Sequence, residues 1–132
     1  MTHRFTLRVY YEDTDLAGIV YYANYLKFIE RARSEWVRDL GIDQTAMKAQ
    51  GVVFAVRRVV ADYLAPARFD DLLEVTTEPL AATAARLILR QSVRRGAIVL
   101  FTAEVTLVAV SDSGQPVRLP ATLRQKIAPL PD

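Results

Sequence analysis

The pattern of hydrophobic and polar positions changes its period early in the chain. Over residues 5–11 apolar and polar side chains alternate, which is the period of a strand with one buried face. Over residues 23–40 apolar side chains recur at helical spacing, and Gly41 provides a C-terminal stop. The apolar stripe consists of Leu26, Ile29, Trp36, Val37 and Leu40, widened on one flank by Tyr25, Phe28 and Ala32. A helix with so broad an apolar face is suited to lying across a sheet.

The chain beyond residue 51 favours strands. The predicted strands cover residues 52–63, 72–78, 85–94 and 97–110. Pro79 is expected to end the second strand because proline cannot donate to a ladder, and Arg95-Gly96 is expected to form the last hairpin turn. A short helix or loop over residues 43–50 precedes the strands, and a short helix over 121–127 follows them. This order predicts an α+β fold, a curved antiparallel sheet of about five strands wrapped around one long central helix.

Two features of this arrangement favour self-association. The face of the sheet that points away from the helix is expected to carry much apolar side chain, and the outer strands leave unpaired edges. We therefore expect a dimer at least.

Composition narrows the class of protein. The 132 residues fit one domain, residues 1–132, and 52% hydrophobic with 24% charged residues is typical of a soluble globular chain. No apolar run approaches the roughly 18 residues of a membrane-spanning helix. The N-terminus lacks the apolar segment of a signal peptide, so we expect a cytoplasmic location. A net charge of +2 is too small to indicate a nucleic-acid partner.

The missing residue types restrict the chemistry. The chain has no cysteine, and its one histidine is His3. Disulfides, thiolate sites and Ser-His-Asp triads are therefore excluded, and histidine-rich zinc sites are disfavoured. Any catalysis must come from carboxylates, hydroxyls, backbone dipoles or bound cofactors.

The junction between the first strand and the long helix, residues 11–25, concentrates candidate chemistry. It holds three carboxylates at the start of a helix, where free N–H groups and positive potential are available. From the residues alone, Asp15 is most simply a turn former or helix N-cap, and Glu12 and Asp13 are turn or partner residues. These carboxylates lack the spacing of a calcium loop, so we expect no metal site.

Two polar residues interrupt the apolar stripe of the helix. Arg33 falls inside the stripe and Glu30 at its edge, three positions apart. They can form a boundary salt bridge, with the arginine stem packed on apolar surface. Alternatively, Glu30 lines a ligand cavity beneath the helix. Both interpretations stay open.

Residues 13–25 (DTDLAGIVYYANY) resemble the signature of the 4-hydroxybenzoyl-CoA thioesterase family of hotdog-fold proteins. The match is closer to the Tol-Pal-associated acyl-CoA thioesterase subgroup. Three shorter stretches support the resemblance, at residues 30–33 (ERAR), 63–71 (YLAPARFDD) and 118–120 (RLP). The similarity covers about residues 5–125.

The resemblance implies a hydrolase that cleaves the thioester bond of a short-chain aliphatic or aromatic acyl-CoA, without a cofactor. It places the essential carboxylate at Asp15, as nucleophile or general base. It places the backbone N–H that polarises the thioester carbonyl at Tyr22. Many members of the subgroup have histidine at this position, and a backbone role survives that difference. The family forms homodimers or homotetramers with active sites at the subunit interface, and the subgroup implies peripheral association with a cell-envelope complex.

Further residues are candidates for substrate binding. Gly18 can let the loop backbone approach a ligand closely. Tyr21, Tyr25 and Phe54 can line an acyl tunnel, although aromatic residues at such spacing usually lie in the core. The phosphates of CoA call for cationic groups. The candidates are Arg57, Arg58, Arg86, Arg90 and Arg118, each of which is individually more simply a solvated strand residue.

The main alternative is a non-catalytic acyl-CoA-binding or scaffold protein of the same fold. A hotdog dehydratase is disfavoured, because such enzymes rely on a catalytic histidine and His3 is badly placed to serve as one.

Overall fold

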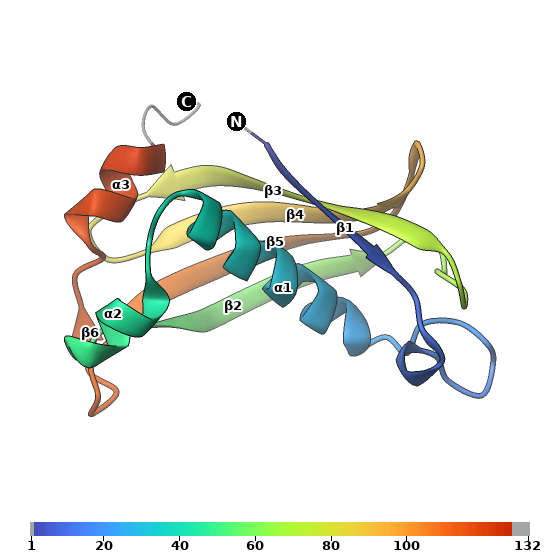
Figure 1. The fold of residues 1–132 in the computed structure, drawn as a ribbon, viewed down its shortest axis with the longest axis horizontal. Helices are drawn as coiled ribbons and strands as arrows, with labels where there is room; N and C mark the ends of the chain where they lie inside the picture. The colour runs from blue at the N-terminus through green and yellow to red at the C-terminus, as the bar shows by residue number, and fades with distance from the viewer. Residues whose placement is uncertain (1, 128–132) are drawn as a thin grey trace.

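The structure, a computed structural model, describes residues 2–127. One antiparallel sheet, ordered β1-β3-β4-β5-β2 with β6 paired to β5, carries helix α1 across one face (Figure 1). The strands are β1 (His3–Arg8), β2 (Val53–Tyr63), β3 (Leu72–Ala82), β4 (Leu87–Arg95), β5 (Ile98–Val110) and β6 (Pro116–Val117). The helices are the 3-10 helix η1 (Tyr11–Asp13), α1 (Asn24–Asp39), α2 (Gln44–Ala49) and α3 (Ala121–Ile127). Positions 1 and 128–132 of the predicted domain lie outside the described residues.

Helix α1 ends at the predicted glycine but buries a shifted face. Gly41 has φ +81°, and its N–H donates to the carbonyl of Arg38 at 2.9 Å. Leu26, expected in the stripe, is 41% exposed. The buried residues are Tyr25, Phe28, Ile29, Ala32, Trp36 and Val37. All three flank residues are therefore buried together with the stripe residues Ile29, Trp36 and Val37, and the prediction was wrong at Leu26.

Strand β3 continues through Pro79. The prediction that Pro79 ends the strand was wrong, because β3 runs to Ala82 with an irregularity between Pro79 and Ala81. The register gives the reason: β1 pairs with β3 no further than Thr77. Among residues 2–127 no strand pairs with that side of β3 beyond Thr77, and a strand tolerates proline at such an unpaired edge.

The first strand is shorter than its alternating pattern. The expected strand reached Tyr11, whereas β1 ends at Arg8 and Tyr11 lies in η1 with 78% of its surface exposed. The buried Asp13 carboxylate accepts a hydrogen bond from the N–H of Tyr10 at 2.8 Å. This local bond turns the chain away from the sheet before the alternation ends.

The sheet face away from α1 is more polar than expected. Gln91 faces the helix, because its Nε2 donates to the carbonyl of Ile29 at 2.9 Å. Its neighbours Arg90 and Ser92 therefore point away, together with their cross-strand partners. Those partners are Glu78, Thr76, Thr102 and Glu104. The expected apolar far face is wrong, and it gives no support for self-association.

The outer edge of β2 still supports the expected self-association. Among the described strands β2 has a single partner, β5, although it is 11 residues long. Val56, Val59 and Val60 on it are 47%, 37% and 49% exposed. A long edge strand that exposes valines is a template for pairing with another chain.

The shorter elements follow the sequence closely. Asp43 caps α2 by accepting from the N–H groups of Thr45 and Ala46, and α3 covers the predicted residues. The two-residue β6 was not predicted. No helix within residues 2–127 has the length and apolar character needed to cross a membrane.

Candidate active site

Asp15 lies on a tight turn between η1 and α1. Thr14 pairs with Val20 across this turn, and the N–H of Asp15 donates to the carbonyl of Ile19 at 2.9 Å. The Asp15 side chain is exposed, and its Oδ1 accepts from the N–H of Ala17 at 2.9 Å. Asp15 is thus a turn former and not the N-cap of α1, a position held by Ala23. The turn also fixes the carboxylate at the molecular surface.

Gly18 closes the same turn in a conformation that favours glycine. Its φ is +78°, and its N–H donates to the carbonyl of Asp15 at 3.0 Å. A Cβ built at Gly18 would meet no atom within 4 Å. The conformation, rather than crowding, explains glycine here, and the open space leaves its backbone accessible.

Tyr22 lies two residues before α1, and its backbone N–H is available as a donor within the described part of the chain. Within residues 2–127 the N–H of Tyr22 has no hydrogen-bond acceptor, whereas the N–H of Tyr21 donates to Asp13 and that of Asn24 donates to Tyr21. The carbonyl of Tyr22 accepts from the Tyr63 hydroxyl at 2.8 Å. The Tyr22 side chain is 62% exposed. The position therefore offers a fixed main chain and an unused N–H directly before the N-cap of α1.

A cavity of about 350 Å³ lies against this helix start. Its lining residues are Ile19, Val20, Tyr22, Tyr25, Tyr63, Leu64, Ala65 and Pro66. Asp15 is outside this lining, but its main-chain partner Ile19 belongs to it. The structure thus brings the Asp15 turn, the Tyr22 N–H and a largely apolar cavity to one end of the sheet.

Tyr63 was missed as a site residue. Its ring packs edge-on to Tyr22, Tyr25 and Phe101, at centroid distances of 6.1, 5.5 and 5.0 Å. Partial burial raises the pKa of its phenol, with the neighbouring Tyr22 and Tyr25 acting in the same direction. Tyr63 ends β2 and opens the stretch 63–71 that supported the family resemblance. Its position in that motif was the available signal.

The predicted tyrosines differ in burial. Tyr25 is 3% exposed and stacks on Phe101 at 5.0 Å, so it lies mainly in the core and only borders the cavity. Its oxygen accepts from the N–H of Ala67 at 3.0 Å, and burial raises the pKa of its phenol. Tyr21 is 45% exposed and packs edge-on to Tyr22 at 5.0 Å.

A second cavity, of about 190 Å³, lies between α1, α2 and β2. Glu30, Arg33 and Phe54 are among its lining residues. The ion pairs of the described residues do not include Glu30 with Arg33, so the predicted salt bridge is wrong. Arg33 instead donates from Nη1 to Oε1 of Gln91 at 3.0 Å. Burial lowers the pKa of Arg33, and the charge of Glu30 opposes that shift.

Gln91 explains why Arg33 turns inward. It is fully buried in β4, and its Nε2 donates to Thr77 Oγ1 at 2.8 Å as well as to the carbonyl of Ile29. Its Oε1 needs a donor, which Arg33 supplies. Sequence pattern gave no indication of this long-range network.

The predicted arginines are not gathered at the Asp15 turn. Arg57 and Arg58 lie at a bulge in β2, and Arg90 lies on the far face, 3.8 Å from Glu78. Arg86 precedes β4, and Arg118 follows β6 beside a cavity of about 340 Å³. The β3–β4 turn and β6 lie at the end of the sheet opposite the Asp15 loop (Figure 1). One subunit therefore does not assemble a single cationic site from them.

A family model described as the thioesterase-like superfamily matches residues 9–127, and the chain belongs to this superfamily. The chain is 44% identical over 108 residues to the acyl-CoA thioester hydrolase YbgC of Escherichia coli O6:H1, covering 81% of each protein. It is 41% identical over 123 residues to the acyl-CoA thioesterase YbgC of Haemophilus influenzae, covering 91% of this chain and 90% of that one. The crystal structure of a probable thioesterase from Bartonella henselae superposes with a TM-score of 0.87 at 38% identity, covering 91% of this chain and 100% of that one.

These findings confirm the expected fold and family. The antiparallel sheet with one long helix across it is the predicted α+β hotdog arrangement. The resemblance seen in residues 13–25 therefore reflects membership of the thioesterase class.

Proposed function

We propose that this protein hydrolyses the thioester bond of a short-chain aliphatic or aromatic acyl-CoA. The observation that carries the proposal is the N–H of Tyr22, which has no acceptor within residues 2–127. Tyr22 lies just before α1, lines a cavity and is close to the turn of Asp15. The names of the YbgC relatives from Escherichia coli and Haemophilus influenzae support the choice of acyl-CoA as substrate.

In the proposed reaction Asp15 either deprotonates an attacking water or attacks the acyl carbon itself. In the second case water then hydrolyses the acyl-aspartyl intermediate. On either route the C–S bond breaks, the carboxylic acid is released, and CoA leaves as a thiolate that takes up a proton. The Tyr22 N–H donates to the carbonyl oxygen as negative charge develops on it. Loss of such a donor typically raises the barrier by about 3–4 kcal/mol, roughly two to three decades in rate.

We further propose that the functional unit is a homodimer, or a tetramer of such dimers, with the sites at the interface. Pairing of two β2 edges would cover Val56, Val59 and Val60. Leu16, at the tip of the Asp15 turn, is fully exposed in the single chain, which is consistent with an interface close to the site. In such a dimer Arg57 and Arg58, which lie on β2, would be at the interface, and we propose them as the groups that bind the CoA phosphates.

The proposed substrate also determines the proposed location. CoA thioesters are made and used inside the cell, so we propose a cytoplasmic enzyme. Peripheral association with a cell-envelope complex stays a prediction from the family resemblance.

A panel of acyl-CoAs tests this function. Purified protein is mixed with short-chain, long-chain and aromatic acyl-CoAs, and released CoA thiol is measured. We expect turnover of at least one short-chain or aromatic substrate. Tight binding without hydrolysis across the whole panel would instead support the alternative, a non-catalytic acyl-CoA-binding protein of the same fold.

A further inference from the structure

The backbone of residues 66–68 contacts the elements that carry the candidate site. The carbonyl of Ala67 accepts from the N–H of Val20 at 2.8 Å, and Arg68 pairs with Ile19. The N–H of Ala67 donates to the hydroxyl oxygen of Tyr25, in the first turn of α1, at 3.0 Å. Ala67 is fully buried. The segment therefore supports both the Asp15 turn and the start of α1.

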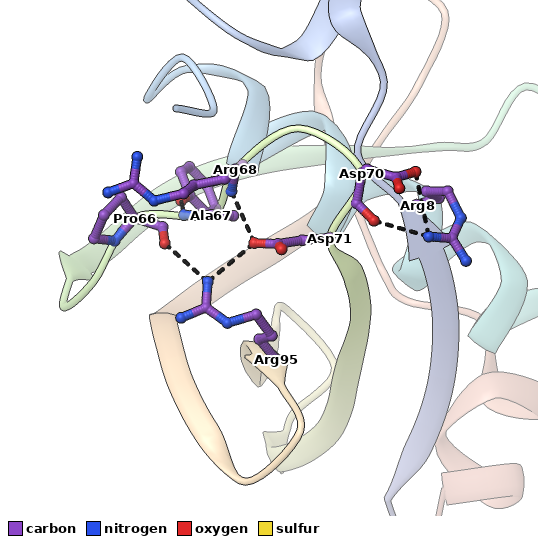
Figure 2. Close-up of polar contacts among 8 residues, drawn as sticks. Arg8, Pro66, Ala67, Arg68, Asp70, Asp71 and Arg95 are labelled. Atoms are coloured by element: carbon purple, nitrogen blue, oxygen red, sulfur yellow. Dashed lines mark hydrogen bonds and ion pairs between the residues drawn. The ribbon is translucent and has the colours of Figure 1, made fainter. Parts of the chain in front are cut away.

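An ion pair holds this segment in place (Figure 2). Oδ2 of Asp71 accepts from the N–H of Arg68 at 2.9 Å and from Nη1 of Arg95 at 3.0 Å. The same Nη1 donates to the carbonyl of Pro66 at 3.2 Å. Arg95 comes from the end of β4 and Asp71 from the residue before β3. Two side chains thus tie the segment to the ends of two sheet strands.

This pair is better shielded than an ordinary surface salt bridge. The side chains of Arg95 and Asp71 are 37% and 23% exposed. Each also binds a backbone group of residues 66–68, which restricts the pair to one geometry. Exposed pairs without such restriction contribute little, whereas a bonded network fixes the position of its members.

We infer that Asp71 and Arg95 are positioning residues, which hold segment 66–68 and, through it, the Asp15 turn and the Tyr22 N–H. The inference rests on the proposed function for its catalytic consequence. Neither side chain lines the cavity beside Tyr22, so their action is indirect. A displacement of about 1 Å in a reacting group can lower the rate by about a hundredfold, so a loosened support should appear in kcat.

The neighbouring pair Arg8–Asp70 provides a matched control. Arg8 Nη1 lies 2.8 Å from the carbonyl oxygen of Asp70 and 3.4 Å from its Oδ1 (Figure 2). These side chains are 48% and 68% exposed, and they connect the turn before β3 to β1 rather than to residues 66–68. Asp70 has φ +71°, a conformation that asparagine tolerates, so Asp70→Asn removes a charge without adding strain.

The kinetic test compares Asp71→Asn, Arg95→Gln, Arg95→Lys and Asp70→Asn with the wild type. We expect kcat to fall about 10- to 100-fold in the first two variants with KM little changed, because binding is retained while alignment is lost. Arg95→Lys keeps the charge and should recover much of the loss, and Asp70→Asn should match the wild type. Unchanged kcat in both Asp71→Asn and Arg95→Gln, or an equal loss in Asp70→Asn, would overturn the inference.

Hydrogen exchange supplies a readout that does not depend on hydrolysis. In Asp71→Asn and Arg95→Gln the amides of Val20 and Ala67 should exchange faster, while amides in the centre of β4 and β5 should not change. Exchange at Val20 and Ala67 that stays at the wild-type rate would contradict the positioning role. If the wild type hydrolyses no acyl-CoA, the proposed function fails, and the exchange result still decides whether this pair supports the segment.

Discussion

At the scale of single residues, hydrogen bonds of tyrosine hydroxyls define the site region more sharply than the apolar pattern does. Tyr25 places its ring in the core and its oxygen against the N–H of Ala67. Tyr63 orients the carbonyl of Tyr22 from the end of β2. These contacts join residues about 40 positions apart in the chain, so hydrophobic periodicity could not reveal them. They are the reason that the start of α1 has a defined geometry.

The Tyr25 hydroxyl gives a test at this scale. In Tyr25→Phe the buried N–H of Ala67 loses its acceptor, and we expect the free energy of unfolding to fall by about 1–3 kcal/mol. Urea titrations of the variant and the wild type measure this change. Tyr63→Phe is a suitable comparison, because Tyr63 is 48% exposed and water can replace its bond to Tyr22.

Tyr25→Phe should also change how the free energy of unfolding depends on pH. Burial raises the pKa of Tyr25 in the folded state, so the fold favours the neutral phenol. The stabilisation is complete below the unfolded pKa of about 10 and is lost as pH rises through the folded pKa. The stability lost by the wild type above about pH 10 should therefore be smaller in Tyr25→Phe. An identical decline in both proteins would contradict the assignment of this shift to Tyr25.

At the scale of elements, local signals predicted most of the fold and contacts between elements corrected the rest. The period of residues 23–40 and the Gly41 stop identified α1, and the expected turn at Arg95-Gly96 identified the β4–β5 hairpin one residue early, since Arg95 ends β4 and Gly96 and Ala97 form the turn. Pro79 was misjudged because the effect of a proline depends on whether a partner strand lies beside it. Leu26 was misjudged because a helix wheel does not show which part of a broad apolar face meets the sheet.

In the candidate site too, local features were evident in the sequence, whereas contacts between distant segments were not. The turn at Asp15 and the glycine beside it were evident in the sequence, and the family resemblance drew attention to Tyr22. Tyr63, and the support from Asp71 and Arg95, depend on contacts between distant segments. The charges of Arg86 and Arg118 were visible in the sequence, but the sequence did not show that the β3–β4 turn and β6, where they lie, are at the end of the sheet opposite the Asp15 loop.

Gly18 and Gly114 form a matched pair of turn glycines. Their φ angles are +78° and +79°, and a Cβ at either would meet no atom within 4 Å. Gly18→Ala and Gly114→Ala should therefore each lower the free energy of unfolding by about 1 kcal/mol, from backbone conformation alone. If the loop backbone approaches the substrate as proposed, Gly18→Ala alone should reduce kcat/KM. Equal activity in the two variants would show that the backbone at Gly18 is not part of the site.

At the scale of the whole molecule, no described strand pairs with the outer edge of β2, and the far face of the sheet is polar. This combination favours association along the edge rather than face to face. Edge pairing would place the β2 strands of two subunits side by side, and the cavity lined by Tyr63, at the end of β2, would lie close to the join. The proposed interface and the proposed site are thus connected through one strand.

Charges introduced on β2 test this association. Val56→Lys with Val59→Lys should shift the protein toward a monomer in sedimentation or light scattering, because lysine on an edge strand opposes pairing. Ile98→Lys is the control: this residue is 54% exposed at the start of β5 and does not belong to the β2 edge. A double variant that keeps the wild-type mass and cooperative unfolding would show that the β2 edge is not the interface.

The central claim, that Asp15 carries the hydrolysis of acyl-CoA, is tested most directly by Asp15→Asn. Asparagine preserves the side-chain oxygen that accepts from the N–H of Ala17 but cannot act as a base or as an efficient nucleophile. With fold and oligomer verified, kcat/KM on each hydrolysed acyl-CoA should fall by about two to four decades. An Asp15→Asn protein that turns over these substrates at the wild-type rate would contradict the account.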